Sequence, residues 1–471
     1  IRYEMLFAGR HPAQVVEQGG VSFGNKSENF MPAPLMQIET HETLPEHADC
    51  VVIGAGIVGV SAAYWLSRAG LRVVLLEKGR VGAEQSSRNW GWCRQQNRDA
   101  RELPLSTKSL GLWEQMAEDI GADLGFRRCG LLYLSNDQAE LDGWANWGRF
   151  AQGEGVDTRM LDSAQATARG AATGQSWVGG VWSPTDGIAD PSRAAPLIAQ
   201  GAIKHGATVV QNCAARGIET SAGAVSGVVT ERGTIKTSQV VLSGGAWAGS
   251  FLHQSGIFFP QASVRSSILS LNPVPRDLPD ALHTAAASVT RRHDGGYTVA
   301  VSGRSHFDPT LRMILGAKHF LPMFAKRWKS LSPGGLQAWK AAFETRAIWA
   351  LDQQTPMERN RILDPRPSKA HVDEALRRAR ALLPALKDVG MQQSWAGYID
   401  STPDGVPVID SDIGVPGLTL AAGLSGHGFG IGPGVGHLVA DLVLNRQPIT
   451  ETAQYKLNRF DQSQWGKVSK F

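Results

Sequence analysis

A run of apolar residues followed by regularly spaced glycines begins at residue 50 of this 471-residue chain. Residues 50–53 are apolar, which predicts a short buried strand. Apolar side chains in residues 57–69 recur on one face of a helix, which Gly70 would end. Residues 73–76 form a second apolar run that closes on Glu77. The pattern therefore predicts a strand, a glycine turn, a helix and a second strand parallel to the first.

Similar patterns continue along the chain. Helical spacing predicts helices over residues 102–120, 137–152, 194–205, 320–350, 371–386 and 437–444. Alternating or continuous apolar runs predict strands over residues 130–134, 207–210, 234–243, 264–271, 288–303 (with a turn at 294–296) and 417–422. Strands that feed a helix or a glycine turn occur near residues 50, 210, 245 and 420, with other material between them. We therefore expect a parallel sheet assembled from distant segments, beside a largely antiparallel sheet.

The glycine turn has the spacing that a dinucleotide requires, Gly54-Ala55-Gly56-Ile57-Val58-Gly59. The first glycine permits a tight turn, the second lets the main chain approach a pyrophosphate, and the third lets helix and strand pack closely. The N-terminus of the following helix favours negative charge. Glu77, at the end of the second strand, can accept a hydrogen bond from an adenosine ribose hydroxyl. We predict that the chain binds a dinucleotide.

Composition narrows the class of protein. With 42% hydrophobic and 19% charged residues, the chain is typical of a globular protein, and its net charge of +4 argues against a nucleic-acid surface. No apolar stretch reaches membrane-spanning length. The four cysteines lie far apart without metal-ligand spacing, which indicates free thiols in a reducing compartment, so we expect a cytoplasmic location and no metal. Residues 1–48 are polar and interrupted by Gly and Pro, and we expect them to form an N-terminal extension.

Five ordered motifs together resemble the FAD-dependent D-amino acid oxidase superfamily, in the branch of glycine oxidase, sarcosine oxidase and gamma-glutamylputrescine oxidase. They span residues 49–446; residues 1–48 and 306–361 lie outside the match. The motifs are the glycine turn ending in Glu77-Lys78, Asp186-Gly187 with Asp190-Pro191, Ser243-Gly244-Gly245-Ala246-Trp247, Thr402-Pro403-Asp404-Gly405-Val406-Pro407-Val408-Ile409, and Gly423-Leu424-Ser425-Gly426-His427-Gly428.

This resemblance implies an α/β fold (α+β overall) with two domains. A discontinuous Rossmann-like FAD-binding domain would comprise residues 49–100, 185–255 and 395–446. An antiparallel-sheet substrate domain would comprise residues 101–184 and 256–394, followed by a C-terminal tail over 447–471. The cofactor would be FAD rather than NAD. It would be held without a covalent bond, because Gly397 and Arg88 stand where some relatives carry a flavin-linking cysteine or histidine.

The resemblance also assigns cofactor-binding residues along the chain. The segment 86–92 would run past the pyrophosphate toward the flavin ring, and the turn 423–428 would offer main-chain N–H groups to that ring. The residues expected at FAD are Gly54, Gly56, Ile57, Val58, Gly59, Glu77, Lys78, Ser86, Ser87, Arg88, Asn89, Trp90, Gly91, Trp92, Ala215, Gly244, Gly245, Trp247, Gly423, Gly426, His427 and Gly428.

The reaction implied is oxidation of the carbon–nitrogen bond of an amino acid or a related primary or secondary amine to an imine. Electrons would pass to O2, to a quinone or to a carrier protein; Thr298 stands near the position where sarcosine oxidases carry an oxygen-activating lysine. His427 is expected beside the flavin in a neutral form, and simple packing beneath the ring is an equal alternative.

A substrate carboxylate would require an arginine. Arg94 and Arg291 are the candidates we name, and Arg265, Arg292 and Arg346 also qualify by position. Trp90, Trp92 and Trp395 could wall the pocket or contact an alkylated cation. For each of these side chains, ordinary packing or an ion pair is the competing interpretation.

Two other functions stay open at this point. A flavoprotein of the same fold could oxidise the C–OH bond of a 2-hydroxy acid, or the chain could be a flavin-bound subunit without catalysis of its own. Substrate identity, stereochemistry and oligomeric state are not specified by these patterns.

Overall fold

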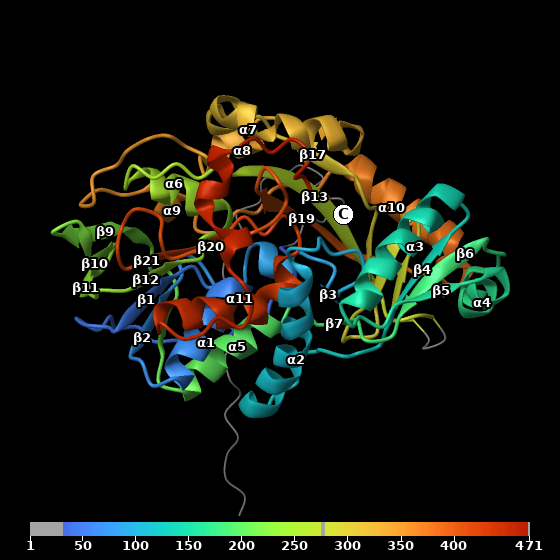
Figure 1. Ribbon diagram of the computed structural model, residues 1–471, viewed down its shortest axis with the longest axis horizontal. Helices are drawn as coiled ribbons and strands as arrows, with labels where there is room; N and C mark the ends of the chain where they lie inside the picture. The colour runs from blue at the N-terminus through green and yellow to red at the C-terminus, as the bar shows by residue number, and fades with distance from the viewer. Residues whose placement is uncertain (1–31, 275–277, 470–471) are drawn as a thin grey trace, which may run out of the picture.

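A six-stranded sheet forms the first layer of the molecule, in the left half of Figure 1. The computed structural model describes residues 32–274 and 278–469. The strand order is β20-β21-β12-β1-β2-β8, and all neighbours are parallel except β20 and β21. The strands are β1 (Cys50–Ile53), β2 (Val73–Leu76), β8 (Thr208–Val210), β12 (Val240–Leu242), β20 (Val408–Asp410) and β21 (Leu418–Ala422). Strands buried on both faces require continuous apolar runs, which is why these segments have no alternation.

Helices cover one face of this sheet and smaller elements cover the other. Val52 and Leu75 face a core shared with the helices, whereas Val51 and Val74 face the opposite core. The helices of the first face, grouped in the lower part of Figure 1, are α1 (Ile57–Arg68), α2 (Leu103–Ile120), α5 (Ala194–Lys204) and α11 (Gly428–Val443). The opposite core includes residues of β9 (Ala215–Ser221), β10 (Ala224–Thr230), β11 (Gly233–Lys236) and α6 (Ala248–His253).

One helix departs from the expected domain division. The fully buried ring of Trp113 on α2 stacks with Phe126 and donates its indole N–H to the Gly430 carbonyl of α11 at 2.9 Å. Helix α2 therefore belongs to the core of the six-stranded layer, although the sequence division placed residues 101–184 with the second sheet.

A ten-stranded, largely antiparallel sheet forms the second layer. Its order is β18-β17-β13-β16-β15-β14-β4-β6-β5, and β19 pairs with β13 at ten positions. The strands are β4 (Leu131–Ser135), β5 (Arg159–Leu161), β6 (Gly179–Ser183), β13 (Ala262–Leu271), β14 (Ala281–His283), β15 (Ser288–Arg291), β16 (Tyr297–Ala300), β17 (Ser305–Phe307), β18 (Leu331–Pro333) and β19 (Met391–Ser401). A separate short ribbon pairs β3 (Trp92–Cys93) with β7 (Gly187–Ile188).

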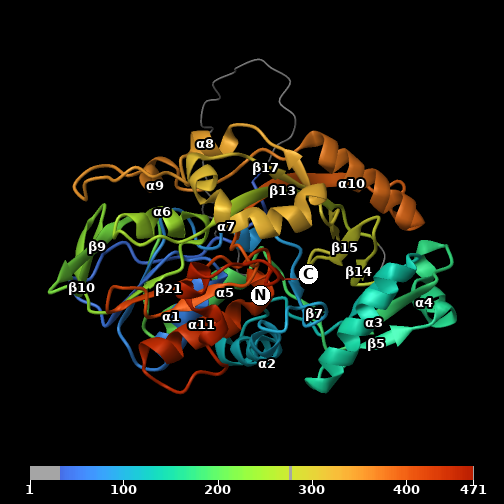
Figure 2. The same cartoon turned by 45° about the horizontal axis from the view of Figure 1, so that its top comes forward.

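Helices also cover this second sheet. Leu269 and Val299 of the sheet share a core with Val372 and Leu382 of α10 (Lys369–Leu382). Helices α3 (Gln138–Gly153) and α4 (Ser163–Arg169) lie at the β5–β6 end, on the right in Figure 2. The mixed architecture confirms the expected fold class of a Rossmann-like layer and an antiparallel sheet.

Three sequence-based element predictions were wrong. Residues 320–350 are not one helix: the Thr310 hydroxyl caps α7 (Leu311–Arg327), and Pro333-Gly334-Gly335 separates it from α8 (Gln337–Ala341), while α9 (Pro356–Arg359) follows later. Residues 234–243 form two strands, β11 and β12, in different sheets.

The last helix begins at Gly428, nine residues before the expected start at residue 437. Its glycines permit close packing against α1, because a Cβ on Gly436 would lie 2.4 Å from the Ser61 Cβ. Helix–helix contact therefore overrides the low helix propensity of glycine.

The two terminal segments lie against the body where they are described. The Met36 and His41 main-chain N–H groups donate to the carbonyls of Ser192 and Val209, both at 2.8 Å. Of the expected extension over 1–48, residues 1–31 lie outside the described residues. Near the other end, Arg459 pairs with the buried Asp404 at 3.0 Å, which attaches the C-terminal segment to the Thr402-Pro403-Asp404 turn.

Candidate functional site

The glycine turn after β1 tolerates no side chain at its two tightest positions. Gly54 adopts φ +98°, and a Cβ there would lie 2.6 Å from the Ser243 carbonyl oxygen at the end of β12. A Cβ on Gly59 would lie 1.8 Å from the Gly54 carbonyl oxygen. The turn and the start of α1 are therefore compressed against β12, which leaves main-chain atoms exposed toward the cavity above them.

Glu77 holds this turn to the end of β2. Its carboxylate accepts the main-chain N–H of Ala55 at 2.9 Å and that of Gly79 at 2.7 Å. Burial raises the pKa of Glu77. The neighbouring Lys78 pairs with Glu84 and lies with its Nζ 5.0 Å from the ring centre of Trp247. The carboxylate of Glu77 lines the cavity, and its role toward a ribose hydroxyl stays a prediction.

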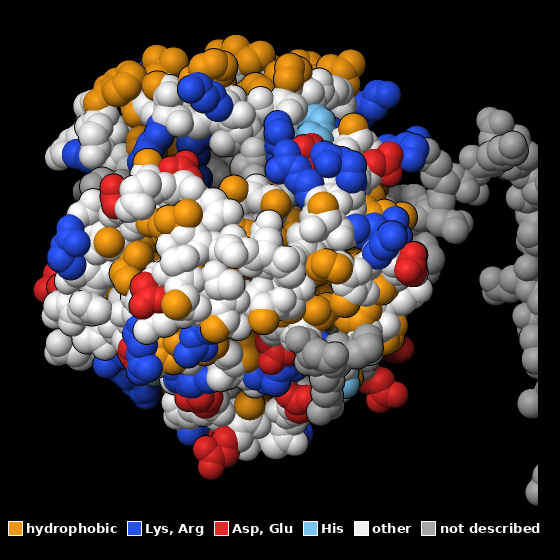
Figure 3. All heavy atoms as spheres, turned by 90° about the vertical axis from the view of Figure 1, so that its right-hand side faces the viewer, with side chains coloured by type: hydrophobic (Ala, Val, Ile, Leu, Met, Phe, Trp, Pro, Cys, Tyr) orange, Lys and Arg blue, Asp and Glu red, His pale blue; other side chains and the backbone are white. Residues whose placement is uncertain are grey.

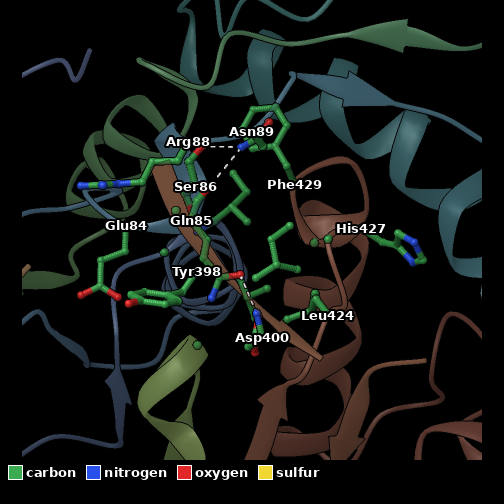
Figure 4. Close-up of a pocket in the computed structure, with 18 of the residues that line it drawn as sticks. Glu84, Gln85, Ser86, Arg88, Asn89, Tyr398, Asp400, Leu424, His427 and Phe429 are labelled. Atoms are coloured by element: carbon green, nitrogen blue, oxygen red, sulfur yellow. Dashed lines mark hydrogen bonds between the residues drawn. The ribbon is translucent and has the colours of Figure 1, made fainter. Parts of the chain in front are cut away.

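A cavity of about 450 Å³ lies between the two sheets. Residues of the six-stranded layer line one part of it, including Gly56, Glu77 and Ala215. Residues Trp92, Arg94 and Arg304 line the part next to the ten-stranded sheet. Figure 4 shows Ser86, Arg88 and Asn89 on one side of this space, with Leu424 and Phe429 approaching it from the α11 segment.

The loop over residues 84–92 is fixed from three directions. Ser86 Oγ accepts the N–H of Ile57, the first residue of α1, at 2.8 Å. Arg88 is 5% exposed, donates to the Ala396 carbonyl at 2.7 Å and pairs with Asp364 at 2.5 Å. Its side chain passes within 3.2 Å of where a Cβ would stand on Gly397. The two positions that some relatives use for covalent attachment are thus in contact here, and neither offers a nucleophile.

The second glycine turn is tied to β19. The Asp400 side chain accepts the Gly423 N–H, and its carbonyl accepts the Ser425 N–H, both at 2.8 Å. Burial raises the pKa of Asp400. Ser425 adopts φ +52°, and α11 begins three residues later at Gly428. The N-terminal ends of α1 and α11 both line the cavity, so two helix dipoles favour a bound anion.

His427, the cap residue of α11, points away from the other labelled side chains (Figure 4). Its Nδ1 lies 3.1 Å from the carboxylate of Glu102, which is fully buried. Burial, with the positive charge of Arg98 as a second cause, lowers the pKa of His427 to about 4. The ring is therefore neutral at ordinary pH and donates Nδ1–H to Glu102. This placement favours the packing interpretation of His427 over direct contact with a substrate.

Aromatic and basic side chains make up the part of the cavity next to the second sheet. Trp90 and Trp92 meet edge to face at 5.3 Å, and the Trp92 indole N–H donates to the Thr290 hydroxyl at 2.7 Å. Arg94 donates to the Gln96 carbonyl at 2.5 Å and to the Tyr133 hydroxyl at 3.3 Å. Among the described residues, no carboxylate pairs with Arg94.

Three site residues were missed from the sequence. Arg98 lines the cavity and is 3% exposed; burial lowers its pKa to about 10, and its Nη1 finds no partner within the described parts of the chain. Arg304 also lines the cavity, and Glu102 supports His427 from behind. In the sequence, only Arg98 could have been suspected, because it lies in the dense run of polar residues after Trp92.

Several expected site residues lie elsewhere. Arg291 is not in the cavity lining; it pairs with Asp280 at 3.2 Å and lies over the Tyr297 ring. Arg265 is buried against Asp308, and Arg292 pairs with Asp294. The other expected residues outside the lining are Gly59, Ser87, Gly91, Thr298, Arg346, Trp395 and Gly423.

The remaining expected cofactor residues line this one cavity. They are Gly54, Gly56, Ile57, Val58, Glu77, Lys78, Ser86, Arg88, Asn89, Trp90, Trp92, Ala215, Gly244, Gly245, Trp247, Gly426, His427 and Gly428. Glycine turns that a Cβ would fill, two helix N-termini and a carboxylate at the end of β2 fit the phosphates and ribose of a dinucleotide.

Comparisons with known proteins agree with this geometry. Residues 49–442 match the family model described as FAD dependent oxidoreductase. The chain is 24% identical to human mitochondrial sarcosine dehydrogenase over 89% of its own length and 42% of that protein, so it spans less than half of this relative. It is 25% identical to glycine oxidase of Geobacillus kaustophilus over 87% of its own length and 97% of that protein. The solved structure of L-amino acid deaminase from Proteus myxofaciens in complex with anthranilate superposes with a TM-score of 0.87 at 27% identity, covering 92% of this chain and 98% of that one.

Proposed function

This chain belongs to the DAO family of FAD dependent oxidoreductases, and from that premise we propose that it oxidises the carbon–nitrogen bond of a carboxylate-bearing amine to an imine. The observation that carries the proposal is Arg94, a cavity arginine with no carboxylate partner among the described residues. The relatives named for glycine, sarcosine and L-amino acids support it, since each of those compounds carries an amine beside a carboxylate. An amino acid or a close relative is therefore the proposed substrate.

The cofactor would be held mainly by main-chain groups. The turn around Gly56 and the N-terminus of α1 would face the pyrophosphate, and Glu77 would face the adenosine ribose. The turn 423–428 would offer N–H groups to the flavin ring. Bound FAD supplies the two-electron oxidant that no protein side chain provides. Among the described residues, none of the four cysteines lines the cavity, which supports non-covalent binding.

Arg94 would orient the substrate. Its planar guanidinium can bind a carboxylate with two parallel hydrogen bonds, which fixes the amine-bearing carbon relative to the cavity wall. Trp90 and Trp92 line the adjacent part of the cavity, where their rings would exclude water from a bound substrate. This positioning is one contribution that the protein would make to the rate.

The same basic groups favour the reactive form of the amine. Oxidation requires a neutral nitrogen, and the two guanidinium groups of Arg94 and Arg98 disfavour a further positive charge in the cavity. Glu102 and Asp186, the carboxylates next to these arginines, do not line the cavity. The carboxylates that do line it already have partners: Glu77 binds the Ala55 N–H, Glu84 pairs with Lys78, and Asp400 binds the Gly423 N–H. A substrate bound here would therefore lose its ammonium proton to solvent more readily than in water, without a dedicated base.

The test is anaerobic bleaching of the visible flavin band. The FAD-loaded protein is mixed with D- and L-amino acids, N-methyl and cyclic amino acids, polyamines and 2-hydroxy acids, and air is then readmitted. Bleaching by amino acids, together with release of a 2-oxo acid and ammonia, is the expected result. Bleaching by the matched 2-hydroxy acid alone would instead show a C–OH dehydrogenase, and an inert flavin would leave the subunit interpretation. The rate of reoxidation in air separates O2 from a quinone or carrier acceptor.

A decarboxylated partner of each active amino acid makes the test specific for Arg94. If the carboxylate binds this arginine, the simple amine reacts far more slowly in the wild-type protein, and the Arg94→Ala variant no longer distinguishes the pair. Equal preference in both proteins would assign carboxylate recognition to another residue.

A further inference from the structure

Two arginines line the cavity, and the protein provides a carboxylate partner for neither. Arg94 and Arg98 both lie in the lining, and no ion pair joins either of them to an acid among the described residues. Arg98 is 3% exposed, and its Nη1 is buried without a hydrogen-bond partner in the described parts of the chain. Such a group is costly, because its N–H donors have left water without gaining an acceptor. A bound anion would supply the acceptor.

The loop that carries the two arginines is fixed in place. The buried carboxylate of Asp186 accepts the main-chain N–H groups of Gln95 and Gln96 at 2.7 and 3.1 Å. The side-chain amides of both glutamines are hydrogen-bonded as well. The Arg98 Nε–H donates to the Arg94 carbonyl at 3.4 Å, which keeps the two residues together. The polar groups between the arginines are thus satisfied within the protein, and the guanidinium groups are what the loop offers to the cavity.

This loop belongs to the part of the cavity next to the ten-stranded sheet. Arg94 donates to the Tyr133 hydroxyl of β4 at 3.3 Å, and its guanidinium carbon lies 5.8 Å from the ring centre of Trp92. The glycine turn after β1, which fits the phosphates of a dinucleotide, lines the other part. Arg98 therefore suits an acidic group of the substrate better than the phosphates of the cofactor.

Arg98 contrasts with basic side chains on the outer surface. On the face drawn in Figure 3, several groups of Lys and Arg side chains lie against Asp and Glu. No helix in the described part of the chain is long and apolar enough to cross a membrane, and α10 carries the ion pairs Lys369–Asp373 and Arg378–Glu374. Inside the cavity, by contrast, the carboxylates of the described lining are engaged by other groups, so Arg98 faces a space without an available acid.

The charges of the two guanidinium groups favour two anionic groups over one. Burial, with the positive charge of Arg94 as the second cause, lowers the pKa of Arg98 to about 10. Glu102 and Asp186 offset part of the repulsion from behind the lining, but among the described residues no hydrogen bond joins them to either guanidinium. One carboxylate would neutralise one arginine and leave donors of the other unused. Two carboxylates match both the charge and the donors.

We propose that Arg98 forms a second anion subsite beside Arg94, so that the substrate is an amine carrying two carboxylates. Arg94 would bind the carboxylate next to the reacting carbon, and Arg98 would bind the carboxylate at the other end of the molecule. Acidic amino acids have this chemistry. The inference rests on the proposed function for the amine, whereas the anion subsite itself does not depend on the reaction.

The first test measures binding without any reaction. The FAD-loaded protein is titrated in a calorimeter with succinate, glutarate and adipate, which carry no amine, and with butyrate as the monocarboxylate. We expect at least one dicarboxylate to bind about 10- to 100-fold more tightly than butyrate, because one more charge-assisted pair forms. Arg98→Met, which keeps the side-chain length without the charge, should remove this preference, and Arg98→Lys should recover part of it. Arg292→Met, at an ion pair outside the cavity, is the matched control and should keep the preference.

The second test uses the reaction. Glutamate or aspartate should reduce the flavin with a kcat/KM at least tenfold above that of glutamine or asparagine, the neutral amides of the same size, and Arg98→Met should abolish the difference. Dicarboxylate binding through Arg98 without reduction by any amine would refute the proposed function and support the anion subsite. Reduction by neutral amino acids with no preference for acidic ones would overturn the subsite and leave the proposed function standing.

Three further results would overturn the proposal. The first is a wild-type protein that binds no dicarboxylate more tightly than butyrate, a comparison that requires no variant to fold. The second is an equal loss of butyrate and dicarboxylate affinity in Arg98→Met, which would assign both arginines to one carboxylate. The third is a shifted reduction potential of the flavin in Arg98→Met with an unchanged dicarboxylate preference, which would assign this arginine to the cofactor. Flavin absorbance per protein checks that each variant retains FAD.

Discussion

The two parts of the cavity are built from different kinds of atoms. In the part over the six-stranded sheet, which we call the main-chain part, glycine turns bring the main chain to the cavity beside Glu77, and a Cβ on Gly59 would lie 1.8 Å from the Gly54 carbonyl oxygen. The part next to the ten-stranded sheet, which we call the side-chain part, is lined by side chains such as those of Trp92 and Arg94. A main-chain surface admits almost no substitution, whereas a side-chain surface can change without moving the backbone. The first part therefore suits an invariant cofactor, and the second part suits a variable substrate.

The largest effect is expected where the main-chain part is tightest. Gly59→Ala places a methyl group into the Gly54 carbonyl and within 2.6 Å of Ser243 Oγ, so the turn has to open. We expect loss of most bound FAD, measured by flavin absorbance per protein after desalting, and a lower thermal midpoint. Gly111→Ala in α2 is the control, because nothing lies within 4 Å of its Cβ and helix propensity favours alanine. Full retention of FAD by Gly59→Ala would show that the turn is less constrained than described.

The next effect concerns the side-chain part. Arg94→Ala should raise KM for a carboxylate substrate by about 10- to 100-fold while FAD content stays normal, because one charge-assisted pair is removed. Arg94→Lys should recover only part of this, since lysine lacks the planar fork. Arg292→Ala, which breaks an ion pair outside the cavity, is the control. Parallel loss of FAD in Arg94→Ala would contradict the separation of the two parts.

The pattern of success and failure in the sequence predictions follows the same division. The turn at 54–59, Glu77 and the turn at 423–428 were predictable, because short local motifs determine main-chain shape. Arg94 and Arg291 were equivalent in sequence, and only the structure shows that one lines the cavity while the other pairs with Asp280. The contact between His427 and Glu102 joins residues 325 positions apart, which no local pattern reveals.

A smaller effect is expected on the pH dependence of stability, through the buried His427 ring. The pKa of His427 is lowered to about 4, so the folded protein keeps this ring neutral down to that pH, while the unfolded chain binds the proton near the ordinary value of about 6.5. Stability is therefore fully present above about pH 6.5 and is lost as pH falls toward 4. His427→Asn should reduce the loss of unfolding free energy between pH 7 and 5 by about 2 kcal/mol. Denaturant titrations at pH 7 and pH 5 measure the unfolding free energy of both proteins. If the variant loses as much unfolding free energy between these pH values as the wild type, the His427 ring is not desolvated.

Burial also lowers the pKa of His283 to about 4, so the double variant His283→Gln/His427→Asn should flatten the profile further. The activity profile should show no step from His427 between pH 5 and 9, because the ring does not titrate there.

The pairing of β12 with β21 has a consequence for how the chain is made. Val240 of β12 pairs with Leu418 of β21, so one edge of β12 stays unpaired until β21 has been synthesised. At ordinary translation rates the interval is on the order of 10 to 35 s, during which a buried-type apolar edge stays open. Open edges of this kind recruit other strands. Ribosome-bound chains truncated before residue 418 should therefore be the aggregation-prone species, and the yield of active protein should depend on chaperones acting in that interval more than on the stability of the finished fold.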